Sequence, residues 1–149
     1  MRVGIISGTV FGTADLVADE AASMLAGAGH EPVRLRPATV DALLELDADA
    51  WLLVSSTTGM GELPETLTPF FFEMRDRFPL LTGKPFGVIA LGDSAYGDTF
   101  CQGGEQLREL WLELQAQELQ PMLRLDASES VTPEEDAAPW LQTFAAQLG

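Results

Sequence analysis

Short apolar runs alternate with amphipathic segments about five times along this chain of 149 residues. The run at 50–55 is almost continuously apolar, as expected for a central strand with both faces covered. Similar runs stand at 2–6 and 86–91, and apolar residues recur at helical spacing within 14–28, 65–78, 104–117 and 133–148. This alternation predicts an α/β fold in which helices cover both faces of an open parallel sheet.

The remaining elements are shorter. We expect a polar edge strand over 30–36, a helical turn over 40–46 and a last strand over 122–125. His30, the only histidine, is expected to be a solvated residue at the start of the edge strand rather than a catalytic or metal-binding group. Phe78 is expected on the buried face of its helix, and the three tryptophans are expected in the core: Trp51, Trp111 and Trp140.

Composition limits the class of protein. The length predicts a single domain over 1–149, and the lack of an 18-residue apolar span or a signal sequence predicts a cytoplasmic protein. The single cysteine, Cys101, agrees with a reducing compartment. A net charge of −15 argues against nucleic acid and membrane surfaces as partners and favours proteins with basic surfaces. Composition alone does not distinguish this role from a contribution to solubility.

The loop at 7–14, Ser-Gly-Thr-Val-Phe-Gly-Thr-Ala, joins the first strand to the first helix. Free amides at a helix N-terminus and nearby hydroxyls favour a phosphate there. The loop contains no Lys or Arg, so it suits a phosphate that stays bound through neutral donors. It matches neither the P-loop nor the dinucleotide fingerprint, and an ordinary strand-to-helix turn remains the alternative.

Two more Ser/Thr/Gly loops, at 56–64 and 92–101, each follow an apolar strand. The carboxyl ends of parallel strands meet at one edge, so all three loops should meet there. Tyr96, the only tyrosine, stands among Gly, Asp and Ser in the third loop. A flat aromatic ligand would give this ring a stacking partner, whereas a surface tyrosine is the plainer alternative. A phosphate and a flat ring together suggest a mononucleotide-like cofactor.

The three loops resemble those of the flavodoxin family. Gly-Thr-x-x-Gly-Thr, Ser-Thr-Thr-Gly-x-Gly-Glu-Leu-Pro and Gly-Asp-Ser-x-Tyr-Gly-Asp-x-Phe-Cys follow the first, third and fourth strands in that order. The whole chain is most similar to short-chain bacterial flavodoxins of the MioC type, and it also looks like the FMN domain of diflavin reductases. The resemblance implies a three-layer αβα sandwich, a five-stranded parallel sheet in the order 2-1-3-4-5, and non-covalently bound FMN. The unsplit stretch at 122–125 agrees with the short-chain class.

The resemblance also implies which residues bind the cofactor. The phosphate would be held by Ser7, Thr9, Val10, Phe11, Gly12 and Thr13. The flavin ring would be lined by Ser56, Thr57, Thr58, Gly59, Met60, Gly61, Leu91, Gly92, Asp93, Tyr96, Asp98, Thr99, Phe100 and Cys101, with Tyr96 stacked on its outer face. Many relatives have Trp or Tyr where this chain has Thr58, so its inner flavin face is covered by aliphatic groups or left more open.

These features predict a monomeric one-electron carrier with no substrate site beyond the flavin. An acidic rim of Glu62, Asp93 and Asp98 would face a basic-surfaced NADPH-dependent flavodoxin or ferredoxin reductase and acceptor redox enzymes. The alternative is a flavodoxin-like NAD(P)H:quinone reductase, which needs a further pocket that no segment is left to build. A phosphoryl-receiver domain is disfavoured, because Ser7 and Ser55-Ser56 stand where it needs acidic residues.

Overall fold

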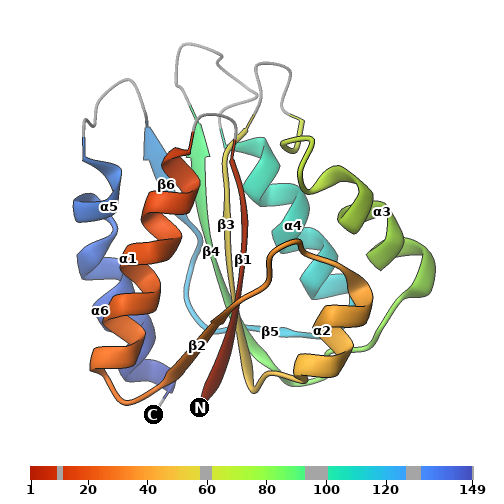
Figure 1. Ribbon diagram of the computed structural model, residues 1–149, viewed down its shortest axis with the longest axis horizontal. Helices are drawn as coiled ribbons and strands as arrows, with labels where there is room; N and C mark the ends of the chain where they lie inside the picture. Colours follow the sequence, from red (N-terminus) through yellow and green to blue (C-terminus); the bar gives the residue numbers. More distant parts are fainter. Residues whose placement is uncertain (10–11, 58–61, 93–100, 127–131, 149) are drawn as a thin grey trace.

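A parallel sheet with the strand order β2-β1-β3-β4-β5 runs through the centre of the molecule (Figure 1). The computed structural model describes residues 1–9, 12–57, 62–92, 101–126 and 132–148. The first four strands are β1 (Arg2–Gly8), β2 (Glu31–Arg34), β3 (Ala50–Ser55) and β4 (Pro85–Gly92). Their order and their parallel pairing confirm the predicted topology.

Helices cover both faces of this sheet and complete the predicted three layers (Figure 1). One face carries α1 (Thr13–Gly27), α5 (Pro133–Asp136) and α6 (Ala138–Leu148). The other face carries α2 (Val40–Leu46), α3 (Thr68–Arg77) and α4 (Gln102–Glu113). Among the described residues, no helix has both the length and the apolar character needed to cross a membrane.

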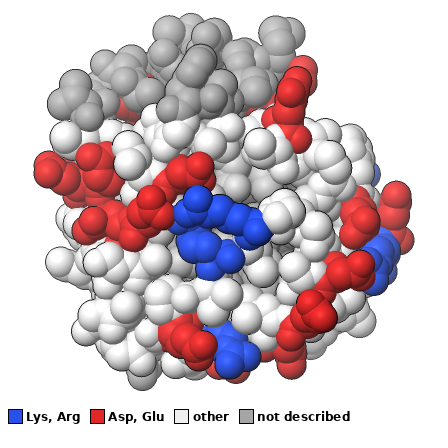
Figure 2. Space-filling view, viewed as in Figure 1, with Lys and Arg blue, Asp and Glu red and all other residues white. Residues whose placement is uncertain are grey.

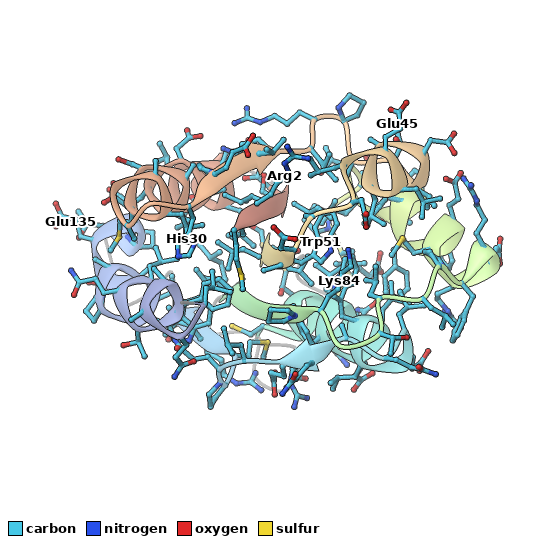
Figure 3. The ribbon with its side chains drawn as sticks, turned by 90° about the horizontal axis from the view of Figure 1, so that it is seen from below. Arg2, His30, Glu45, Trp51, Lys84 and Glu135 are labelled. Atoms are coloured by element: carbon cyan, nitrogen blue, oxygen red, sulfur yellow. The ribbon has the colours of Figure 1, made fainter. Side chains whose placement is uncertain are left out.

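The central strand β3 is buried along its whole length, as its apolar run predicts. Trp51 lies in the layer of α3 and α4, where its ring meets Trp111 edge-on with a centroid distance of 6.4 Å. Gly4 on β1 makes room for this indole, because a Cβ at that position would lie 2.2 Å from the Trp51 ring. Figure 3 shows Trp51 in the interior, viewed from below. Glycine on one strand thus makes room for the tryptophan on the neighbouring strand.

The fifth position in the sheet differs from the single strand expected at 122–125. Two short strands, β5 (Gln117–Glu118) and β6 (Leu123–Asp126), both pair with β4. The four residues between them include Pro121, which has no amide hydrogen to donate to a sheet. Its carbonyl instead accepts a hydrogen bond of 2.9 Å from the Trp140 indole. The predicted last strand is present as β6, one residue later than expected, whereas the short strand β5 before the proline was not predicted.

His30 contradicts its sequence-based prediction, because it is 8% exposed rather than solvated. Its Nδ1 lies 3.2 Å from the Met1 ammonium, and its Nε2 lies 3.2 Å from the carbonyl oxygen of Ala145. Figure 3 shows the ring beside α6. With the proton on Nε2, Nδ1 can accept from the ammonium and Nε2 can donate to the carbonyl. His30 therefore joins the chain start to the last helix.

Two aromatic predictions also need correction. Phe78 lies just after the end of α3 with a φ of 49°, and it is 46% exposed because this left-handed residue turns away from the buried face. Trp140 is only partly buried, since its indole N–H reaches the Pro121 carbonyl near the surface. Its ring stacks on Phe144 with a centroid distance of 5.3 Å. Trp51 and Trp111 are fully buried, as predicted.

Candidate functional site

The carboxyl ends of β1, β3 and β4 lie side by side at one edge of the sheet, the upper edge in Figure 1. The Ser56 amide donates a hydrogen bond of 2.9 Å to the Gly8 carbonyl, which joins the last residue of β1 to the residue just after β3. The Gly103 amide donates a bond of 3.0 Å to the Thr57 hydroxyl, which joins the end of β3 to α4. The structure thus brings together the described ends of all three predicted loops.

The N-terminus of α1 lies at this edge. Its capping residue, Gly12, has a φ of 90°, and no described side chain caps the helix. The Gly12 amide itself donates to Thr9 Oγ1 at 2.6 Å, and the first helical bond runs from the Leu16 amide to the Gly12 carbonyl. The amides of the first turn point outward at such a helix end, together with the positive end of the helix dipole. This geometry fits a phosphate.

Ser7 lies beneath that first turn, and its hydroxyl has two charged neighbours. Ser7 Oγ donates to Asp15 Oδ1 at 2.8 Å and accepts a bond of 2.9 Å from Arg34 Nη2. Arg34 comes from the edge strand β2, so a guanidinium stands beside a loop that contains no basic residue of its own. The sequence interpretation missed Arg34, whose position in a polar edge strand gives no sign that its side chain reaches this loop.

The end of β4 supplies the third side of the site. Leu91 is 4% exposed within the core beneath α1 and α6, and Gly92 pairs with Asp126 on β6. Cys101 precedes α4 with a φ of 61° and is fully buried. Its thiol contacts the Ala90 carbonyl at 3.4 Å, and burial raises its pKa to about 11. The thiol is therefore a neutral packing group in the core.

The match to known proteins agrees with this geometry. The model of the family described as "Flavodoxin" matches residues 5–140. The chain belongs to the flavodoxin family. Flavodoxin YqcA of Escherichia coli is 38% identical, with 99% of this chain and 98% of the relative covered. A MioC homolog of Pasteurella multocida is 36% identical, with 99% and 98% covered.

A solved structure extends the match to three dimensions. The C101A mutant of a flavodoxin from Pseudomonas aeruginosa superimposes with a TM-score of 0.95 at 56% identity, and the match covers 99% of each chain. The flavodoxin fold predicted from the three loops is thus confirmed. As a flavodoxin, the chain binds FMN and serves as an electron carrier.

The predicted site residues divide into two groups. The structure places Ser7, Thr9, Gly12, Thr13, Ser56, Thr57, Leu91, Gly92 and Cys101 at or beside the edge described above. The others lie outside the described residues and stay predictions: Val10, Phe11, Thr58, Gly59, Met60, Gly61, Asp93, Tyr96, Asp98, Thr99 and Phe100. The first turn of α1 fits the phosphate of FMN. Most of the residues predicted around the ring lie outside the described part of the chain.

Proposed function

We propose that this flavodoxin takes single electrons from a basic-surfaced NADPH-dependent flavodoxin or ferredoxin reductase and delivers them to acceptor redox enzymes in the cytoplasm. Bound FMN supplies the one-electron chemistry, while the protein supplies binding, orientation and electrostatics. The first-turn amides of α1 and the hydroxyls of Thr9 and Thr13 bind the phosphate. The loops after β3 and β4 hold the ring, with Tyr96 on its outer face.

The distribution of charge is the observation that supports a basic partner. Seven of the eight basic residues form ion pairs within the molecule: Arg2, Arg34, Arg36, Arg77, Lys84, Arg108 and Arg124. The eighth, Arg75, lies over the Phe71 ring at 5.7 Å. On the face of the molecule seen in Figure 2, acidic side chains lie beside the few basic ones. Most of the cations are thus paired with carboxylates of the same molecule. An approaching partner therefore meets a negative electrostatic field, which comes from the net charge of −15.

Reduction by such a reductase tests the proposal directly. Stopped-flow measurements with NADPH and a ferredoxin reductase should give a rate that falls as salt rises, because screening removes the attraction. Converting Glu62, Asp93 and Asp98 to their amides should slow the reaction at low salt. A control that converts Glu20, Glu45 and Asp76, which lie within helices, removes the same charge and should slow it less. Equal slowing would mean that the proposed acidic rim has no special role.

A second measurement separates the carrier from a quinone reductase. The holoprotein alone should oxidise NADPH negligibly, with or without an added quinone. Rapid NADPH oxidation without a reductase would contradict the carrier proposal. A rate of reduction insensitive to salt would contradict the electrostatic part of the proposal only.

A further inference from the structure

Arg34 reaches the proposed phosphate loop from the neighbouring strand. The strands pair so that Arg34 stands opposite Ile5, and paired residues on adjacent strands point to the same face of a sheet. That face is covered by α1, since Ile5 packs in the core beneath this helix. The Arg34 side chain is only 15% exposed, whereas its partner Asp19 is 61% exposed. The guanidinium is therefore held between β2 and the first two turns of α1.

The Arg34 side chain contacts three described residues around this position. Its Nη2 donates to Ser7 Oγ at 2.9 Å and lies 3.3 Å from Asp15 Oδ1, while its Nη1 pairs with Asp19. Arg36 also contacts Asp19, at 3.3 Å. Figure 2 shows a basic patch bordered by acidic side chains on this face of the molecule. Two arginines and two aspartates thus join β2 to the start of α1.

The Ser7 hydroxyl already donates its hydrogen bond to one of these aspartates. A hydroxyl has one hydrogen, and that of Ser7 goes to Asp15 at 2.8 Å. While this bond is present, the Ser7 side chain has no hydrogen left to donate to a phosphate. The bond instead fixes Asp15 in the first turn of α1, close to where the phosphate is proposed to bind. An uncompensated Asp15 carboxylate there would repel the phosphate.

We infer that Arg34 is a positioning residue of the phosphate site, where it neutralises Asp15 and holds Ser7 so that the first turn of α1 accepts a dianion. This inference rests on the proposed role of that turn in binding FMN phosphate. Arg34 acts through Ser7 and Asp15 and does not itself contact the phosphate. The phosphate loop thus has neutral donors within reach of its ligand and a partly buried cation, Arg34, behind them.

The test compares FMN with riboflavin, which lacks the phosphate, by titrating each flavin with apoprotein and following flavin fluorescence. Arg34→Met should weaken FMN binding by about 5- to 30-fold and leave riboflavin binding nearly unchanged. Arg34→Lys should recover part of the loss. Arg34→Met combined with Asp15→Asn should also recover it, because the repelling carboxylate is gone. Arg2→Met, which removes an exposed arginine at the other end of β1, is the control and should change neither affinity.

Asp15→Asn in the otherwise unchanged chain gives a second test that keeps Arg34. This variant should tighten FMN relative to riboflavin by about two- to fivefold, since Arg34 is then less neutralised. The inference is overturned if Arg34→Met weakens both flavins equally, or if neither Asp15 variant changes their ratio. If the unchanged protein binds FMN and riboflavin equally, the proposed phosphate site itself is wrong.

Discussion

The hydroxyl of Thr57 accepts a 3.0 Å hydrogen bond from the Gly103 amide, and this contact joins the end of β3 to the first turn of α4. The two segments approach so closely that a Cβ on Gly103 would lie 2.7 Å from the Ser56 carbonyl oxygen. The same atom would lie 3.0 Å from Thr57 Oγ1. A backbone oxygen cannot rotate away as a side chain can, so the approach requires glycine.

Gly103→Ala should therefore lower the free energy of unfolding by about 1–3 kcal/mol, the usual cost of an overpacked contact. It should also weaken FMN binding, because the segment at 56–57 is displaced. Urea denaturation and flavin titration measure the two effects. Gly27→Ala is the matched control in another helix, where a Cβ meets nothing within 4 Å and stability should stay equal or rise slightly. Equal behaviour of the two variants would refute the requirement for glycine.

Thr13→Ala tests the proposed phosphate contact of the first helical residue. The change should weaken FMN binding by about 1–3 kcal/mol, the cost of losing a hydrogen bond to a charged group. Riboflavin binding should not change, and riboflavin should bind the unchanged protein far more weakly than FMN. Thr143→Ala in α6, whose hydroxyl bonds only to the Pro139 carbonyl among the described residues, serves as the control. Loss of affinity for both flavins alike would argue against the contact.

Tyr96→Ala tests the predicted stacking on the flavin ring, a prediction that lies outside the described residues. In the unchanged holoprotein the stacked ring should quench flavin fluorescence strongly. The variant should recover fluorescence from bound flavin and bind it less tightly, because the stacking energy of about 0.5–1.5 kcal/mol is lost. Steady-state fluorescence and flavin titration measure both effects. Unchanged quenching would show that Tyr96 does not touch the ring.

Cys101 should make stability depend on pH in the alkaline range. Burial raises the pKa of its thiol from 9.0 to about 11, so the folded state keeps a proton that the unfolded state loses. The contribution to stability is therefore full below pH 9 and is lost as the pH rises through about 11. Between these values the unfolding free energy of the native protein should fall by up to about 2–3 kcal/mol more than that of Cys101→Ala. Parallel curves for the two proteins would contradict the raised pKa.

The sequence by itself determined the layers and the location of the site. The apolar run of β3, the helical spacing of the amphipathic segments and the polar loops after three strands each follow from neighbours along the chain. Parallel strands place their carboxyl ends together, so the loops after β1, β3 and β4 had to share one edge. Local patterns of this kind need no knowledge of distant residues.

Tertiary structure alone decided which distant side chains meet. Arg34 reaches Ser7 and Asp15 because β2 pairs with β1 in one particular register, and His30 is buried because the chain start and α6 close over it. Pro121 lies between β5 and β6, where its carbonyl accepts a hydrogen bond from the Trp140 indole. A polar residue looks solvated in the sequence until the fold brings it charged or hydrogen-bonding partners. The sequence pattern records the polarity of each residue, whereas packing determines which partners compensate its burial.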